Sequence, residues 1–184
     1  MDLLPFLRTQ VRANRLANHR LHAAMATLSR ADLHAARTSF FPSLAETLNH
    51  ILSVDRYYLA ALHGDAGMVA QWEAFRPCDT LDELAPAQAR CDQRFIDLVE
   101  SLSASQLDEV IALDRGDWVQ RERRGHVIAH LVNHQVHHRG QVHAMLAGTA
   151  VKPPQLDEFL MPSEANLRVA DMAALGWTEA DVFG

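Results

Sequence analysis

Six of the chain's 11 histidines lie in one short stretch between His126 and His143. Histidine titrates near neutral pH, transfers protons and binds divalent metals through an unprotonated ring nitrogen. His134 and His138 are four residues apart, a spacing that stacks two side chains on one face of a helix. Two imidazoles placed in this way can bind one divalent ion, as the HExxH helix of zinc proteases does. Gln135 stands where those proteases have glutamate, so the pattern indicates a metal site without a protease mechanism.

If this stretch is a helix, its histidines point in different directions. At about 100° per residue, His134 and His138 lie at the edge of the apolar stripe, whereas His126, His130 and His137 turn toward solvent. The stripe is formed by Val127, Ile128, Leu131, Val142, Met145 and Leu146. Two ligands hold a metal weakly, so a third must come from another helix. The alternative is a helix whose histidines bind nothing.

Four long helical segments are expected to position these side chains. Apolar residues recur at helical spacing over residues 3–28, and Ser29 to Asp32 interrupts the pattern. A second helix is expected to begin after Ser39, with Pro42 in its first turn, and to end at Gly64. A third begins at Thr80, whose TLDE sequence is a capping-box pattern, and continues through Leu102. The fourth covers Gly125 to about Leu146 and stops at Gly148.

Between the third and fourth helices, residues 110–120 (VIALDRGDWVQ) contain two short β-prone runs around a turn at Asp114 to Asp117. This pattern predicts a small hairpin. The expected fold is therefore all-α, a four-helix bundle with a β-hairpin before the last long helix. We expect one domain over residues 1–184, with a core of about 3–148 and a C-terminal extension over 149–184. The extension could cover the metal site or pack on a second subunit, since Trp177 and Phe183 give it side chains to bury.

The composition excludes several classes of function. The formal net charge is −6, and apart from RERRG at 121–125 there is no basic stretch, so we expect no nucleic-acid partner. No apolar run approaches the roughly 20 residues that span a bilayer, which predicts no membrane association. Cys78 and Cys91 are not in a CxxC arrangement. They are expected to be reduced thiols in a cytoplasmic protein.

Two residues do not suit their expected helices. Asp55 falls within the leucine stripe of the second helix, where a buried carboxylate needs a partner. An arginine or helix-end amides could pair with it, or it could support the metal site; Arg139 is one candidate partner. Gly140 disfavours a helix by about 1 kcal/mol, so we expect a neighbouring helix to approach closely there.

Two segments, TLNHILSVDRYYLAAL (47–62) and NHQVHHRGQVHAML (133–146), together resemble the DinB/YfiT-like family of metal-dependent bacterial proteins. RANRLANHRL (12–21) and SFFPSLAETLNH (39–50) are similar to the N-terminal half of that family. The resemblance covers roughly residues 5–150. It implies a four-helix bundle whose histidine triad takes one ligand from the second helix and two from the fourth, which here are His50, His134 and His138. From the residues alone, His50 lies off the centre of its apolar stripe and could equally be a surface or capping residue.

The resemblance also implies a cofactor and a type of chemistry. The metal would be divalent, as nickel, zinc, iron or manganese, and the substrate a small molecule that includes a low-molecular-weight thiol, as in S-transferases. A homodimer is common in the family. A metal-dependent hydrolase and a non-catalytic metal-binding stress protein remain as alternatives. No general base can be identified; Gln135 or Gln141 could orient a water or substrate, and Tyr57 or Tyr58 could donate a phenolic proton.

Overall fold

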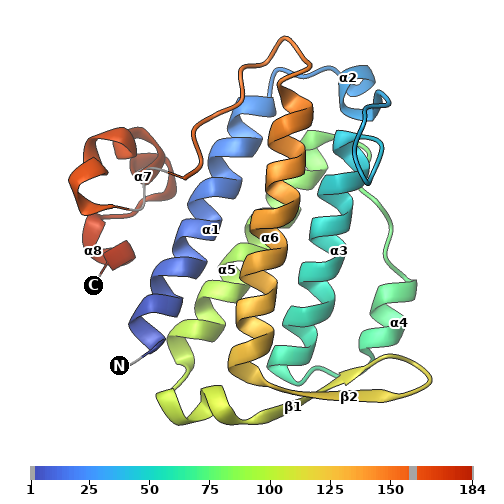
Figure 1. The fold of residues 1–184 in the computed structure, drawn as a ribbon, viewed down its shortest axis with the longest axis vertical. Coiled ribbons are helices and arrows are strands. Elements are labelled where there is room, and N and C mark those ends of the chain that lie inside the picture. The colour runs from blue at the N-terminus through green and yellow to red at the C-terminus, as the bar shows by residue number, and fades with distance from the viewer. Residues whose placement is uncertain (1–2, 158–160, 184) are drawn as a thin grey trace.

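Four long antiparallel helices form a bundle in the computed structural model, which describes residues 3–157 and 161–183 (Figure 1). A two-stranded sheet closes one end of the bundle, and short helices lie at its edges. The long helices are α1 (Leu3–Met25), α3 (Leu44–His63), α5 (Leu81–Ser101) and α6 (Arg124–Leu146). The short elements are α2 (Arg30–His34), α4 (Met68–Glu73), η1 (Ala104–Asp108), β1 (Val110–Asp114), β2 (Val119–Arg123), η3 (Pro162–Leu167), α7 (Val169–Leu175) and α8 (Glu179–Phe183).

Each long helix packs against two neighbours: α1 and α3 both contact α5 and α6. The expected four-helix bundle with a hairpin is thereby confirmed. The interior is made of leucine-rich faces, and Leu21, Leu52, Ile128 and Leu131 are among its fully buried side chains. Cys91 is buried and Cys78 is half-buried, and neither forms a disulfide. None of the described helices is long and apolar enough to cross a membrane.

The start of α3 differs from its expected position. The helix begins at Leu44 because the Ser43 side chain accepts a hydrogen bond from the Glu46 backbone, so Pro42 precedes the helix. The start of α5 was predicted correctly. Thr80 and Glu83 satisfy each other's backbone N–H groups in a capping box.

The other boundaries show where the sequence pattern was weaker. Helix α1 ends at Met25, before the expected Leu28, and the expected break contains the short helix α2, capped by Ser29. Helix α4 lies within the segment expected to be a plain connection. The hairpin continues three residues further than predicted, to Arg123, which pairs with Val110. Figure 1 shows this hairpin crossing the lower end of the bundle beneath α6 and α3.

The described part of the C-terminal extension packs on α1, on the opposite side of the bundle from α2 (Figure 1). Met172 and Val182 form a small apolar cluster with Leu16 and Ala17 of α1. Phe183 lies under the Arg168 guanidinium, 4.8 Å from it, and Trp177 is partly buried against the same cluster. Trp177 and Phe183 thus pack against α1 of the same chain and not over the metal site. Residues 158–160 of the expected extension lie outside the described residues.

Candidate metal centre

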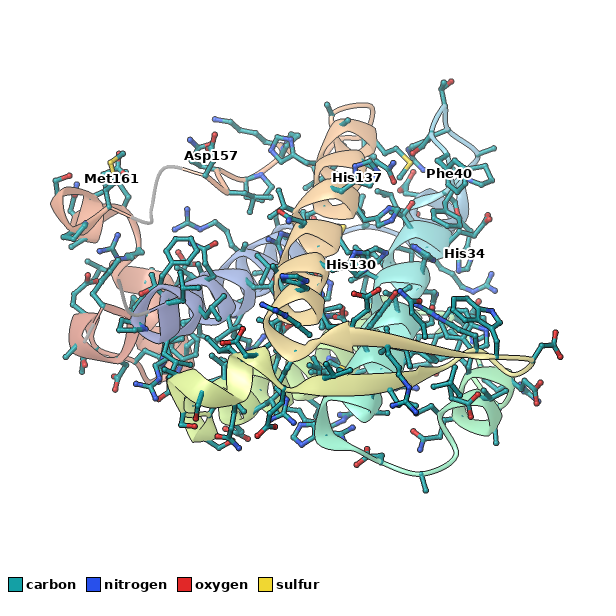
Figure 2. The ribbon with its side chains drawn as sticks, turned by 60° about the horizontal axis from the view of Figure 1, so that its bottom comes forward. His34, Phe40, His130, His137, Asp157 and Met161 are labelled. Carbon is teal, nitrogen blue, oxygen red and sulfur yellow. The ribbon has the colours of Figure 1, made fainter. Side chains whose placement is uncertain are left out.

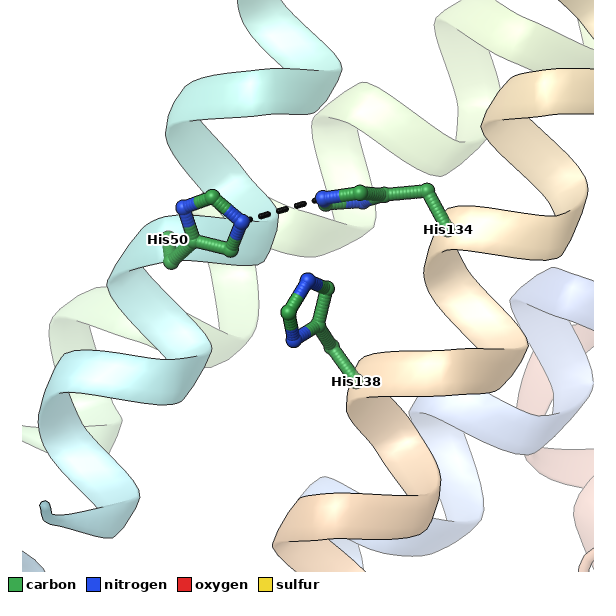
Figure 3. Close-up of side chains that lie close together, drawn as sticks. All are labelled: His50, His134 and His138. Atoms are coloured by element: carbon green, nitrogen blue, oxygen red, sulfur yellow. Dashed lines mark hydrogen bonds between the residues drawn. The ribbon is translucent and has the colours of Figure 1, made fainter. Parts of the chain in front are cut away.

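The imidazoles of His50, His134 and His138 converge between α3 and α6 (Figure 3). One ring nitrogen from each residue lies within 4.8 Å of the other two. Nε2 of His50 is 3.0 Å from Nε2 of His134, and the ring centroids of His50 and His138 are 4.5 Å apart. Two nitrogens bound tetrahedrally to one ion at about 2.1 Å each are about 3.4 Å apart. Small ring movements would therefore bring all three nitrogens onto one divalent ion.

A side-chain relay selects the nitrogen that His138 presents to this centre. Nδ1 of His138 is 2.8 Å from Oε1 of Gln141, and the amide nitrogen of Gln141 is 3.2 Å from Nε2 of His137. Because the Gln141 amide nitrogen donates to His137, its oxygen faces His138 and accepts a hydrogen bond from the Nδ1–H group of that ring. Nε2 of His138 is then left with a free lone pair facing the other two rings. A hydrogen-bonded outer nitrogen is the usual way in which proteins orient a metal-binding histidine.

The three imidazoles are held in the neutral form that binds metals. Burial, with a smaller contribution from His138, lowers the pKa of His50 to about 4. Burial and then the neighbouring histidines lower the pKa of His134 to about 3. The pKa of His138 is also lowered by burial, although its bond to Gln141 opposes this. A neutral imidazole does not have to lose a proton before it coordinates an ion.

An aromatic ring lies against the triad, and two of its histidines, His50 and His134, are partly exposed. The ring of Phe41 lies 4.3 Å from that of His50 and 5.7 Å from that of His138. His130 and His137 are both exposed, as the rotation of the helix predicted, and Figure 2 shows both on α6; the ring of His130 is 6.1 Å from that of His134, and the ring of His137 is 4.7 Å from that of His138. Nδ1 of His134 is buried without a hydrogen-bond partner among the described residues. The donor set of three neutral nitrogens suits a divalent ion, and His134 is its least supported member.

A buried polar network fixes the rotation of α6 and thereby the direction of its histidines. Gln135 and Arg139, each one residue after a triad histidine, turn into the bundle interior and are at most 7% exposed. Gln135 donates to Asp55 of α3, and Arg139 donates to Asn14 and Asn18 of α1. Rotating α6 would break these bonds and leave buried polar groups without partners. The network therefore keeps His134 and His138 facing α3.

The same network corrects the expected partner of Asp55. Its Oδ2 accepts hydrogen bonds from the amides of Gln88 and Gln135, and Arg139 does not contact it directly. Burial, and then the nearby Asp92 carboxylate, raise the pKa of Asp55 well above its ordinary value. Two side-chain amides rather than a salt bridge thus bind Oδ2, while Oδ1 is buried without a hydrogen-bond partner among the described residues. The carboxyl group has no contact with the triad among the described residues.

Other expected roles are also revised. A Cβ on Gly140 would meet nothing within 4 Å, so no helix approaches closely at that turn and the expectation was wrong. Gln135 is committed to the buried network and Gln141 to His138, so neither is free to orient a substrate. The Tyr57 hydroxyl donates to the Asp114 carbonyl, and that of Tyr58 accepts from Arg115. Phe41 and the relay through Gln141 were missed, although the three-residue spacing from His138 to Gln141 was a usable signal.

Comparisons with known proteins identify the family and the fold. The model of the DinB family matches residues 6–170. A DinB-like protein from Bacillus cereus ATCC 10987 has a similar structure, with a TM-score of 0.60 over 79% of this chain and 94% of that chain. The two sequences are 14% identical over this match, so the likeness shows the fold. No protein with a curated description matches the chain.

Proposed function

The chain belongs to the DinB family, and on this premise we propose that it is a divalent-metal enzyme that uses a low-molecular-weight thiol, of the S-transferase type. The observation that carries the proposal is the convergence of His50, His134 and His138 within 4.8 Å of one another. The metal would be nickel, zinc, iron or manganese, since imidazole is a ligand of intermediate character that suits several of these ions.

The composition of the triad supports catalysis over a purely structural metal. Among the described residues, no further histidine, cysteine, aspartate or glutamate joins the three histidines. Structural zinc sites are closed by four protein ligands, whereas catalytic sites leave a position for water or substrate. An ion held by three neutral nitrogens keeps its positive charge and would act as a Lewis acid toward a thiol or a water molecule.

The chain's own side chains would place the reactants at this centre. The ring of Phe41 covers His50 and part of His138, which excludes water from that side. His130, exposed next to His134, supplies an imidazole that can take up the thiol proton. The sulfur would then form a bond to an electrophilic carbon of the second substrate, and the leaving group would depart with its electron pair.

Metal analysis of protein purified without a histidine tag tests whether the triad binds a metal ion. Wild type should carry about one divalent ion per chain. His134→Ala should carry none, and His126→Ala, which removes an exposed histidine from the same helix, should match wild type. Equal metal content in all three proteins would remove the triad as the site.

Addition of thiols to the cobalt- or nickel-loaded protein tests whether the protein uses a thiol as substrate. The proposal expects a change in the visible spectrum of the ion and consumption of thiol with an electrophile. Turnover of esters or amides without thiol would indicate the hydrolase instead. A metal that raises the melting temperature while neither thiols nor electrophiles have any effect would indicate a non-catalytic stress protein. The homodimer and the cytoplasmic location also remain proposals, and light scattering tests the first.

A further inference from the structure

A second concave site lies between α3, α4 and α5 and is lined by none of the triad histidines. Its volume is about 580 Å³, which is within the range of small-molecule sites. Four arginines are among the described residues that line it, and no aspartate or glutamate is. We call this site the arginine groove; the residues that define it are Arg56, Arg76, Arg90, Arg94, Trp72 and Phe75.

The groove is positively charged in a chain whose net charge is −6. Arg94 forms an ion pair with Asp65, so its charge is partly balanced. Arg56 and Arg90 have no ion-pair partner within 4.0 Å in the described part of the chain. Arginine is the side chain best suited to phosphate and carboxylate groups, because its planar fork donates two parallel hydrogen bonds. At least two such forks here remain available to a ligand.

Several of these side chains are held in place before any ligand arrives. The Arg56 guanidinium lies over the ring of Phe75, 5.4 Å from its centre. Arg76 donates to the backbone carbonyls of Glu73 and Phe75, at 3.2 and 3.0 Å. A preorganised guanidinium loses less side-chain entropy when it binds an anion than a freely moving one does. Arg56 and Arg76 are exposed to solvent, but these contacts restrict the positions of their guanidinium groups.

An aromatic side chain, Trp72, lines the groove beside the arginines. Trp72 is 46% exposed and packs edge-on against Tyr57, with 5.9 Å between ring centres, so part of the indole stays open. Cys91 also lines the groove, but burial raises the pKa of its thiol to about 12. The thiol therefore stays protonated and neither repels an anion nor acts as a nucleophile.

We propose that the arginine groove binds a small molecule that carries two or more negative charges, as phosphate or carboxylate groups, next to a planar ring. The arginines would hold the charged groups and Trp72 would stack on the ring. This site is separate from the proposed metal chemistry, so either can fail without the other.

Calorimetric titration with three probes tests the proposal: ADP, which has both features, inorganic pyrophosphate, which has the charge alone, and adenosine, which has the ring alone. Wild type should bind ADP most tightly, pyrophosphate less tightly and adenosine least. The double variant Arg56→Gln/Arg90→Gln should bind ADP at least about tenfold more weakly. Arg121→Gln/Arg123→Gln removes two exposed cations from β2 and should bind like wild type.

Two further variants separate the contributions. Trp72→Leu should weaken ADP and leave pyrophosphate unchanged, because only the ring contact is lost. His134→Ala should bind ADP as wild type does, which excludes a diphosphate held by a metal in the triad. The proposal is overturned if neither ADP nor pyrophosphate binds wild type at millimolar concentration, or if Arg56→Gln/Arg90→Gln binds them unchanged. Tighter binding of a single-stranded oligonucleotide than of ADP would also overturn it, in favour of a nucleic-acid surface.

Discussion

Replacing Gln141 by leucine tests whether the relay behind His138 prepares the metal centre. The substitution removes the acceptor that lies 2.8 Å from Nδ1 of His138 and keeps the size of the side chain. His138 would then lose the bond that fixes both its ring orientation and the position of its proton. Loss of such a partner behind a metal-binding histidine costs about tenfold to 100-fold in metal affinity, or about 1.4–2.7 kcal/mol. We expect the same range here.

Competition with a coloured zinc chelator measures this loss directly. Thermal melting is a second measurement. At a fixed excess of metal, a tenfold weaker affinity removes about 1.4 kcal/mol of the stabilisation by the metal, which lowers the melting temperature by roughly 3–6 °C. Gln141→Glu keeps an acceptor at the same place and should bind metal at least as tightly as wild type. The metal-free variants should melt within about 2 °C of wild type, because Gln141 is only half-buried. Wild-type affinity in Gln141→Leu would refute the relay.

Three other predictions concern the protonation and burial of carboxyl and imidazole groups. Asp55→Ala should cost about 2–5 kcal/mol in urea unfolding, because it leaves the amide of Gln135 unpaired and opens a cavity. Asp55→Asn should stay within about 1 kcal/mol of wild type, and an equal loss in both variants would show that the charge is needed. Burial raises the pKa of Asp92 to about 6 from 3.8, so between pH 4 and 6 the unfolded chain loses a proton that the folded chain keeps. The free energy of unfolding of wild type should therefore fall by about 3 kcal/mol relative to Asp92→Asn as pH rises through this window, and parallel pH profiles would contradict this. Zinc affinity should fall less between pH 7 and 5 than it would for histidines of ordinary pKa, because burial lowers the pKa of His50 to about 4 and of His134 to about 3 and also lowers that of His138; a steep loss beginning near pH 6.5 in chelator competition would contradict this.

Much of the bundle could be predicted because its helices carry local signals. The capping box at Thr80 and the glycine after His63 mark ends that depend on neighbouring residues alone. Helices α2 and α4 were not predicted, because five or six residues are too few to show a helical period. The start of α3 was placed too early since both Ser39 and Ser43 can cap a helix. The sequence does not show which of the two serines the tertiary structure uses.

The site was predictable in part for a similar reason. His134 and His138 form a pair within one helix, so their spacing alone indicates that they face the same way. His50 comes from a different helix, and its place opposite them depends on how α3 packs on α6. Only the family resemblance identified it before the structure was known. The predicted close approach of another helix at Gly140 was wrong, because nothing lies within 4 Å of the place that a side chain would occupy there.

Adjacent residues of α6 lie in two different environments. This limits the positions along α6 at which a metal-binding histidine could stand. His134 and His138 face the centre, while Gln135 and Arg139, one position later, are buried among the polar side chains of the other helices. A histidine moved by one position along α6 would therefore enter the buried network and leave an unpaired polar group there. Because His130 and His137 are exposed, replacing them should cost little folding stability, although it would affect the proposed chemistry. The core of the bundle thus determines the register of the metal-binding face, although none of the core residues needs to touch the metal.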